Sequence, residues 1–441
     1  MARPSFIRRV SQALLAFLCL GPGVEPKSHS ESFSFITIAG VANDREAVDG
    51  TNTGATFLGP TGVSLGPGGD LFIADGSAIR RASPSGTNWI VTTLAGTAPA
   101  HGAQDGTNTD AYFNAPYGLV SSGGSIFIAD TLNHAIRKMV ATGTNWVVNT
   151  IAGQLTSFGS GDGTNGFARF KNPYGITADG AGNLYVSDTY NNLIRKVTPS
   201  GTNWVVTTIA GVTAGGTVDG TNTDAKFKYP VGITADGAGN LFVSDFQNHT
   251  IRKLRPSGTN WITTTIAGLA GFAGSSDGSN TAARFSHPQG IAVSPVGYIY
   301  VADNDSNIVR VIKPFGTNWV VKTIAGLAGN AGSSDGTGSG AQFTSPVGIC
   351  VSPAGTLFLT ESINLLLRQG KLAVLLDFKV ASGKGILSWP IGATGYVAQT
   401  SSRLINPNWT AATNPVTQLG DTCFVTNNVA GAAGYFRLFK P

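Results

Sequence analysis

The sequence predicts an all-β protein built from six copies of one unit, and two observations predict it. The first is a pattern of Asp-Gly, Ala, Phe and Pro that returns six times along the 441 residues at an almost constant interval. The second is the composition: glycine accounts for 59 residues and charged residues for only 12%, so turns are frequent and helix-surface charges are scarce. A fixed repeat of this size indicates supersecondary units that stack or surround an axis.

The repeated pattern can be followed residue by residue. The Asp residues are Asp49, Asp105, Asp162, Asp219, Asp277 and Asp335. The Phe residues are Phe57, Phe113, Phe170, Phe227, Phe285 and Phe343. The prolines, which lie 56 to 58 residues apart, are Pro60, Pro116, Pro173, Pro230, Pro288 and Pro346.

The first segment, residues 1–30, has the pattern of a secretory signal peptide. Arg8 and Arg9 precede an apolar run at residues 10–20, and a Gly-Pro break follows it. The run is too short to span a bilayer, and no later segment is long and apolar enough to do so. We therefore expect a secreted, periplasmic or cell-surface protein without a membrane span.

Each repeat contains four segments with the composition of β-strands. In the third repeat these are residues 175–178, 184–188, 193–197 and 204–211, separated by turns of Gly, Asn, Pro and Ser. The remaining segment, residues 212–229, is a long polar link that carries the Asp-Gly, Ala, Phe and Pro pattern of the next repeat. Four strands and a longer link are typical of a β-propeller blade, whose faces are buried by its neighbours. We expect the Phe of each link to pack between adjacent blades.

The sixth repeat lacks its last strand, and a matching segment lies at the other end of the chain. Strand-like segments follow Pro346 at residues 347–351, 356–360 and 364–369 only. Residues 35–40 read Phe-Ile-Thr-Ile-Ala-Gly, close to the Val-Thr-Thr-Ile-Ala-Gly that ends the third repeat's outer strand. We therefore predict a six-bladed β-propeller with four-stranded blades, in which the N-terminal strand closes the ring and removes the exposed sheet edges.

The second and third strands of the repeats carry a recognisable sequence. Residues 182–197, Gly-Asn-Leu-Tyr-Val-Ser-Asp-Thr-Tyr-Asn-Asn-Leu-Ile-Arg-Lys-Val, resemble an NHL repeat, and so do residues 124–139 and 239–254. Six tandem copies imply an NHL-type six-bladed propeller of the kind found in secreted bacterial proteins. Such propellers include protein- and RNA-binding modules and a few enzymes, such as peptidylglycine lyases, so the fold alone is a weak guide to activity.

The C-terminal segment differs in character from the repeats. Apolar and polar residues alternate at 386–390, 395–399 and 435–438, as in short β-strands. The segment is similar to small C-terminal β domains of secreted bacterial repeat proteins, which implies a role in sorting, surface attachment or glycan contact. We therefore divide the chain into a signal peptide at 1–30, a propeller at 31–375 and a small β domain at 376–441.

Charge and cysteine content exclude some classes of function. The formal net charge of +5 includes Arg3, Arg8 and Arg9 of the predicted signal peptide, and no cluster of Lys and Arg with interleaved aromatic residues is present. We therefore expect no nucleic-acid partner, and we expect a monomer. Cys350 and Cys423 form no disulfide framework, so we expect free buried thiols.

An acidic residue that closes the second strand and an arginine on the third strand recur in every repeat. Because they recur in every blade, a structural ion pair that pins the hairpin is the favoured interpretation, and contact with a ligand is the alternative. The pairs are Asp75 and Arg80, Asp130 and Arg137, Asp188 and Arg195, Asp245 and Arg252, Asp303 and Arg310, and Glu361 and Arg368.

Candidate metal ligands are few. The six Asp-Gly steps could form turns in which Asp bonds its own backbone, or they could supply carboxylates to calcium. His134 and His249 occupy one repeat position in the second and fourth blades, which is too far apart for a shared metal unless both point at the axis. No Gly-x-Ser-x-Gly, His-Glu-x-x-His or Cys-x-x-Cys motif is present. We predict no cofactor, with calcium as the alternative.

The two faces of the predicted propeller differ in variability. Since strands alternate in direction, the links and the turns between second and third strands emerge on one face, which we call the link face. The stereotyped Gly-Thr-Asn turns emerge on the opposite face, the turn face. Binding sites favour variable loops on a rigid frame. The residue directly after each repeat proline varies in chemistry, and the candidate ligand contacts at the channel mouth are Tyr117, Tyr174, Val231, Gln289 and Val347.

Near-identical blades without a singular polar cluster favour a secreted, non-catalytic binding or scaffold propeller whose link face contacts a protein or a glycan. One alternative is a metal-assisted lyase or lactonase with its site in the central channel, because acidic and Asn ligands scattered in sequence leave no motif. Another is an envelope component anchored by the C-terminal segment. Enzymatic activity therefore stays open, although the sequence favours a binding role.

Overall fold

The computed structural model describes residues 32–373 and seven further strands of the C-terminal segment. The described residues fall into two compact units, residues 33–371 and the strands of the C-terminal segment. The predicted signal peptide, residues 1–30, lies outside the described residues.

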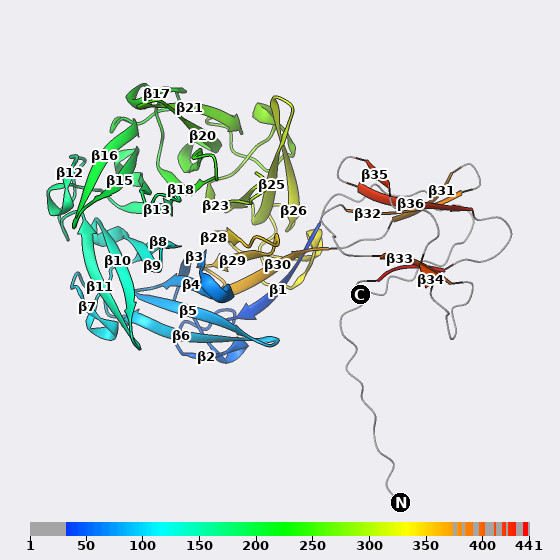
Figure 1. Cartoon of the computed structure of the whole chain (residues 1–441), viewed down its shortest axis with the longest axis horizontal. Coiled ribbons are helices and arrows are strands. Elements are labelled where there is room, and N and C mark those ends of the chain that lie inside the picture. Colours follow the sequence, from blue (N-terminus) through cyan, green and yellow to red (C-terminus); the bar gives the residue numbers. More distant parts are fainter. Residues whose placement is uncertain are drawn as a thin grey trace, which may run out of the picture. The chain divides into compact units, whose positions relative to one another are not determined.

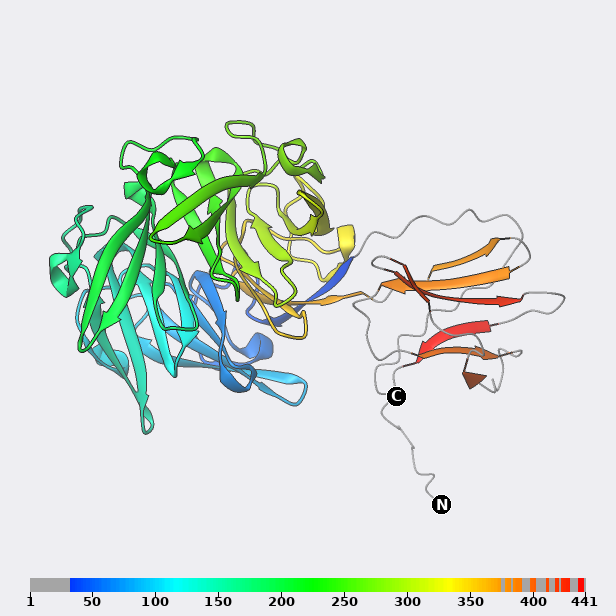
Figure 2. The ribbon, with the colours of Figure 1, turned by 45° about the horizontal axis from the view of Figure 1, so that its top comes forward.

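The larger unit is a ring of six antiparallel β-sheets, numbered here as blades one to six from the blade that begins at Pro60 (Figure 1). Figure 2 shows the same ring turned by 45° about the horizontal axis. The predicted all-β, six-bladed propeller is confirmed. Among the described residues there is no α-helix, only short 3-10 turns.

The strands of the six blades occupy five positions. The first strands, which line the channel, are β3 (Pro60–Leu65), β8 (Pro116–Ser122), β13 (Pro173–Ala178), β18 (Pro230–Ala235), β23 (Pro288–Val293) and β28 (Pro346–Val351). The second strands are β4 (Leu71–Asp75), β9 (Ser125–Asp130), β14 (Leu184–Asp188), β19 (Leu241–Asp245), β24 (Ile299–Asp303) and β29 (Leu357–Glu361). The third strands are β5 (Ala78–Ser85), β10 (Ala135–Thr142), β15 (Leu193–Ser200), β20 (Thr250–Ser257), β25 (Ile308–Phe315) and β30 (Leu366–Leu372).

The outer part of each blade consists of a long fourth strand and a short fifth one. The fourth strands are β6 (Asn88–Gly96), β11 (Asn145–Ala152), β16 (Asn203–Gly211), β21 (Asn260–Ala267), β26 (Asn318–Ala325) and, for blade six, β1 (Phe33–Ala39). The fifth strands are β2 (Gly50–Thr51), β7 (Gly106–Thr107), β12 (Gly163–Thr164), β17 (Gly220–Thr221), β22 (Gly278–Ser279) and β27 (Gly336–Thr337).

The 3-10 turns lie in the links and between strands. After the fifth strands come η1 (Asn52–Gly54), η3 (Asn108–Asp110), η5 (Asn165–Phe167), η7 (Asn222–Asp224), η9 (Asn280–Ala282) and η10 (Gly338–Gly340). Between second and third strands lie η4 (Thr131–Asn133), η6 (Thr189–Asn191) and η8 (Phe246–Asn248), and η2 (Pro67–Gly69) follows β3.

The fifth strand of each blade is an addition to the four that the sequence predicts. In blade three, Gly163 lies opposite Val206 and Thr164 opposite Val205 of the outer strand. The link therefore runs out to the rim and pairs there before it returns to the channel. A strand of two residues shows no alternation, so no sequence pattern reveals it.

The N-terminal strand closes the ring, as predicted. Strand β1 lies between β30 and β27, with Ser34 opposite Thr337 and Phe35 opposite Gly336. The Phe35 side chain is fully buried, and its ring centroid lies 5.0 Å from that of Phe343 in an edge-to-face contact. The first and last parts of the propeller are therefore joined by hydrogen bonds and by packing.

The hydrophobic core lies between adjacent blades. Between blades two and three, Phe127 and Ile136 of blade two pack with Ile176 and Val186 of blade three and with Phe170 of the link. All six repeat phenylalanines are 0% exposed. The expectation that these rings pack between blades is confirmed.

The C-terminal strands form two antiparallel sheets. The four-stranded sheet has the order β31 (Asp377–Ala381), β32 (Lys384–Pro390), β36 (Thr422–Asn428) and β35 (Thr417–Leu419). The three-stranded sheet has the order β34 (Thr410–Ala411), β33 (Val397–Ser401) and β37 (Tyr435–Phe439). In the part of the chain that the structure describes, no helix has the length and apolar character needed to cross a membrane.

Candidate functional site

Each first strand has a β-bulge directly after the repeat proline. In blade three, Pro173 lies opposite Asp188 but Ile176 lies opposite Val186, so β13 has one residue more than β14 between these pairs. The same shift occurs in all six blades. A bulge re-aims the side chains within it. The residue after each proline, Tyr174 in this blade, therefore leaves the regular ladder at the channel mouth.

A glycine follows this residue in every blade and lets neighbouring first strands approach each other. A Cβ atom on Gly175 would overlap the carbonyl oxygen of Val231 in the next blade. The corresponding overlap occurs at each of the six glycines and ends with Gly348 against Thr61, which completes the circle. This close approach brings the variable residues of neighbouring blades together at the mouth.

The five candidate ligand contacts surround the channel mouth, but two of them are bonded to each other. The hydroxyl of Tyr117 in blade two donates a hydrogen bond to Oε1 of Gln289 in blade five, on the opposite side of the ring. The Tyr117 ring also packs on Tyr174, with centroids 4.5 Å apart. Burial raises the pKa of the Tyr117 hydroxyl. Val231 and Val347 are buried, and they offer apolar surface rather than polar contacts.

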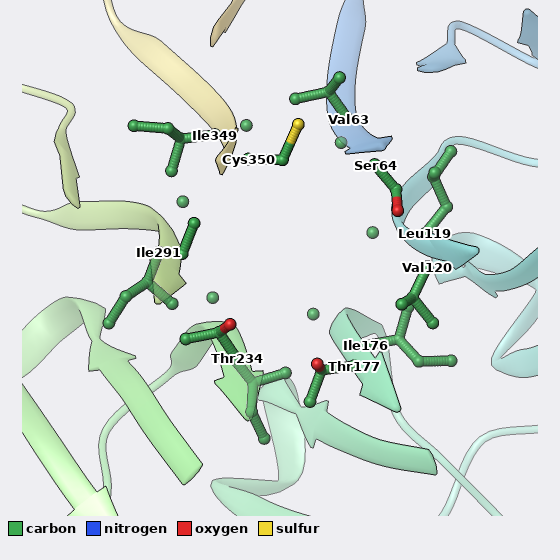
Figure 3. Close-up of a pocket in the computed structure, with 18 of the residues that line it drawn as sticks. Val63, Ser64, Leu119, Val120, Ile176, Thr177, Thr234, Ile291, Ile349 and Cys350 are labelled. Carbon is green, nitrogen blue, oxygen red and sulfur yellow. The ribbon is translucent and has the colours of Figure 1, made fainter. Parts of the chain in front are cut away.

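The first strands enclose a cavity of about 280 Å³ along the channel (Figure 3). The fourth residue after each proline lines it, and these residues are Ser64, Val120, Thr177, Thr234, Ala292 and Cys350. The cavity lining contains no charged side chain. Cys350 has a free thiol, as expected, and it lies in the channel wall. Burial raises the pKa of this thiol to about 12, so it is protonated and a poor nucleophile at neutral pH.

The recurrent acid and arginine pairs are buried ion pairs. In blade three, Nη1 of Arg195 donates to Oδ2 of Asp188 at 2.7 Å, and both side chains are 0% exposed. The backbone N–H of Lys171 and the amide of Asn191 donate to the same carboxylate. Burial raises the pKa of Asp188 to about 6, against the lowering effect of Arg195 and the other donors. The other five pairs have the same arrangement, with N···O distances of 2.5–3.1 Å.

The Asp of each Asp-Gly step bridges two strands. Asp162 accepts a hydrogen bond from Nη2 of Arg195 at 2.8 Å and from the backbone N–H and hydroxyl of Thr208 at 3.0 and 2.9 Å. The predicted turn closed by the aspartate's own backbone is therefore wrong, because donors from the third and fourth strands occupy the carboxylate. The absence of a cofactor stays a prediction, with calcium at these positions as the alternative.

His134 and His249 occupy a position that asparagine fills in other blades. Nδ1 of His134 accepts the N–H of Asn172 at 3.2 Å, just as Oδ1 of Asn192 accepts the N–H of Tyr229 at 2.8 Å. Each residue ends its turn in the left-handed conformation, with φ of 58°. Burial lowers the pKa of both histidines. The two imidazoles therefore tie each turn to the following link.

Sequence reasoning missed an aromatic cluster on the link face. Tyr190, in the turn η6 of blade three, lies between Tyr174 and Tyr229, with ring centroids 6.4 and 5.1 Å away. Together with Tyr117 these residues form the tyrosine row. The available signal was the variation at the turn tips, which are Leu132, Tyr190, Gln247, Asp305 and Ile363.

A second aromatic cluster follows in the next blades. The ring of His287 lies 4.6 Å from that of Phe246 and 4.5 Å from that of His249, measured between centroids. Nδ1 of His287 lies 2.6 Å from Oδ2 of Asp305. The backbone N–H of His287 donates to Nδ1 of His249 at 3.2 Å. We call His249 and His287 the histidine pair.

Comparison with known proteins agrees with the repeats. A family model described as "Teneurin NHL domain" matches residues 37–214. The chain is 28% identical over 296 residues to Protein SUPPRESSOR OF QUENCHING 1, chloroplastic, of Arabidopsis thaliana, which covers 62% of this chain and 26% of that protein. It is 34% identical over 137 residues to NHL repeat-containing protein 2 of Bos taurus, which covers 29% of this chain and 18% of that protein. The chain thus spans about a quarter or less of the length of these two relatives.

A solved structure shows the same architecture. An auxiliary nutrient binding protein from Bacteroides thetaiotaomicron superimposes with a TM-score of 0.57 at 15% sequence identity, covering 78% of this chain and 77% of that chain. At this identity the similarity shows the fold alone. The family match, the relatives and the structure agree that this chain carries NHL repeats arranged as a six-bladed propeller.

Proposed function

We propose that this NHL-repeat propeller is a secreted, non-catalytic binding protein, periplasmic or at the cell surface, that presents its link face to a protein or a glycan. The observation that carries the proposal is the difference between the two faces. The turn face repeats one Gly-Thr-Asn-Trp sequence in blades one to five. The link face repeats its internal bonds but varies the side chains that it exposes.

The exposed side chains of the link face suit recognition. The turn tips Leu132, Tyr190 and Ile363 are 44–47% exposed although they are large and apolar. Beneath each of these three tips, an asparagine of the turn donates both to the carboxylate of the buried ion pair and to a carbonyl oxygen of the link. Variable groups on a rigid base lose little conformational entropy on binding.

The similar Bacteroides structure is titled an auxiliary nutrient binding protein. A binding role for that propeller accords with the proposal for this one. The alternative is a metal-assisted lyase or lactonase with its site in the central channel. No group of three or more His, Cys, Asp or Glu side chains that could hold a metal ion occurs within the part of the chain described.

The first prediction compares the two faces by substitution in the full chain. A link-face variant carries Leu132→Ser, Tyr190→Ser and Ile363→Ser, and a turn-face variant carries Thr202→Ala, Thr259→Ala and Thr317→Ala, all at exposed positions. Immobilised protein is probed with a panel of soluble polysaccharides and purified envelope proteins. We expect a ligand retained by the wild type and by the turn-face variant to be lost by the link-face variant, because only the link face would contact it. Loss in the turn-face variant alone, or chemical turnover of the ligand, would contradict the proposal.

A further inference from the structure

We propose that the tyrosine row and the histidine pair form one binding site for an uncharged saccharide. This inference rests on the proposed function and specifies the ligand chemistry of the link face. The site would lie where blades three to five depart furthest from sixfold repetition. Of the tyrosine row, Tyr174, Tyr190 and Tyr229 would contact the ligand together with His249 and His287, and Tyr117 packs on Tyr174.

The tyrosine row offers aromatic surface that is already fixed in place. Tyr190 is 44% exposed, and its ring is held almost parallel to that of Tyr174, at an interplanar angle of 21°. Tyr229 contacts the Tyr190 ring edge to face, at an interplanar angle of 81°. A sugar ring has an apolar C–H face and a rim of hydroxyls, which matches a ring with an apolar body and a polar tip. Such rigid rings bind at low entropic cost.

The histidine pair supplies a hydrogen-bond donor and an acceptor side by side. Nδ1 of His249 accepts the backbone N–H of His287, so the proton of the neutral His249 ring is on Nε2 and can be donated. Nδ1 of His287 donates to the carboxylate of Asp305, so the Nε2 atom of the neutral ring is an acceptor. The two ring centroids are 4.5 Å apart. A hydroxyl group both donates and accepts, so neighbouring sugar hydroxyls satisfy both nitrogens.

The charge of the row favours a neutral ligand. Burial raises the pKa of the Tyr117 and Tyr174 hydroxyls further above neutrality, so both are uncharged. Gln289, which accepts the hydroxyl of Tyr117, is uncharged as well. A nucleic acid depends on cationic side chains for most of its affinity, and the row supplies none.

The other blades lack this combination, so the site should occur once per chain. The turn-tip position that Tyr190 occupies in blade three is occupied by Leu132 in blade two and by Ile363 in blade six. The residue before the repeat proline, Tyr229 in blade four, is Ala115 in blade two and Ser345 in blade six. These positions share the backbone conformation of the tyrosine row, with φ of 47–51° at the residue before the proline. They therefore provide matched controls on the same face.

The second prediction is tested by titration calorimetry of the full chain with gluco-, manno-, xylo- and galacto-hexaoses. We expect at least one of these neutral oligosaccharides to bind with a stoichiometry of one. Tyr190→Ala should weaken that binding at least tenfold, and His287→Ala should weaken it by a similar factor. Leu132→Ala and Ile363→Ala remove apolar groups of equal exposure from the same turn position, and they should leave the affinity unchanged.

The outcomes separate this inference from the broader proposal. If no neutral hexaose binds, or if Leu132→Ala weakens binding as much as Tyr190→Ala does, the saccharide site is refuted. A proline-rich peptide that binds and is lost with Tyr190→Ala would also refute it, while the link-face proposal would stand. An oligonucleotide that binds in the same way would refute both. Binding that survives all link-face substitutions would refute both. Because Tyr190 is exposed, thermal unfolding of its variant should match the wild type, and this measurement excludes misfolding as the cause.

Discussion

One arginine side chain in each blade connects several separate segments of chain. In blade two, Nη1 of Arg137 donates to Asp130 and Nη2 donates to Asp105, and each nitrogen also donates to a carbonyl of the link. The guanidinium lies over the ring of Phe113, with Cζ 5.1 Å from the centroid. The six arginines are 0% exposed, and their Nε atoms have no acceptor among the described residues. Loss of one partner would leave a buried charge unpaired, so we expect each cluster to be needed for the stability of its blade.

Part of this cluster could be predicted from the sequence. Asp188 and Arg195 are seven residues apart across one hairpin, so local geometry alone places them together. Asp162 lies 33 residues before Arg195, and the link that carries it reaches the arginine only by running along the outer strand. No local rule connects the two, so the sequence suggested a turn or a calcium ligand instead. The acceptor role of His134 was hidden for the same reason, since its donor belongs to the next link.

The third prediction concerns the pH dependence of stability. Burial holds the pKa of His134 below its ordinary value of 6.5, so the folded state binds fewer protons than the unfolded state as the pH falls through this value. This histidine therefore contributes stability that is present above pH 6.5 and is lost as the pH falls toward its folded pKa. In the variant His134→Asn, Oδ1 of the asparagine replaces Nδ1 as the hydrogen-bond acceptor, as Oδ1 of Asn192 does in blade three. The variant should therefore lose less stability than the wild type as the pH falls. Urea unfolding of both proteins at pH 8 and pH 5.5 measures this change in the free energy of unfolding.

The comparison with wild type is needed because buried carboxyls titrate in the same range. Burial raises the pKa of Asp188 and Asp245 to about 6 and that of Asp303 to about 7. Their contribution has the opposite sign, since a raised folded pKa favours the folded state at low pH. These groups are common to both proteins, so the difference between the two isolates His134. Equal pH dependence in both would show that His134 does not accept this hydrogen bond in its neutral form.

At the scale of the element, blades one to five are each shaped by two bulges. The first follows the repeat proline and carries the mouth residue and the glycine of the inner ring. The second lies between Ile194 and Arg195, where the third and fourth strands slip by one residue. Bulges bend a strand and redirect its side chains. One bulge therefore places the variable residue at the channel mouth. The other lies next to the arginine of the buried ion pair.

The sequence predicts the strands of a blade well and the bulges not at all. The four long strands are rich in β-branched and aromatic residues and are bounded by Gly and Asn, so composition locates them. A bulge is a property of pairing between two strands, and one strand's sequence does not contain it. The recurrent glycine after the mouth residue can be seen in the sequence. Its contact with the next blade can be seen only in the structure, because it depends on how the blades pack around the axis.

The fourth prediction compares two glycines of blade three. A methyl group on Gly175 would overlap the backbone of the next first strand, whereas one on Gly180 would meet no atom within 4 Å. Gly175→Ala should therefore lower the free energy of unfolding by about 1–3 kcal/mol, the usual cost of overpacking, and push the first strands of blades three and four apart. Gly180→Ala should stay within about 0.5 kcal/mol of wild type, as surface substitutions do. Denaturant unfolding measures both, and equal effects would show that the inner ring tolerates expansion.

For the whole molecule, the number of blades and the closure of the ring follow from the period of the sequence and from its incomplete last repeat. The residues that meet on the link face do not. Tyr174 and Tyr190 belong to blade three, and Tyr229 directly precedes the first strand of blade four. Their rings lie together because neighbouring blades pack side by side around the axis. The fold depends on what the repeats share, and the candidate site depends on where they differ. A search for repeated patterns detects the shared residues but not the differing ones.

The last prediction tests closure of the ring. Phe35 and Ile36 are neighbours on β1, but Phe35 is 0% exposed against Phe343 whereas Ile36 is 47% exposed. Phe35→Ala should destabilise the propeller by about 3–5 kcal/mol, as expected for a buried aromatic side chain, and Ile36→Ala should change it little. Protease digestion should cut Phe35→Ala first in blade six, because the strand that joins the two ends of the ring is held by non-covalent contacts alone. If the two variants unfold alike, or if cleavage begins in another blade, β1 does not close the ring in solution.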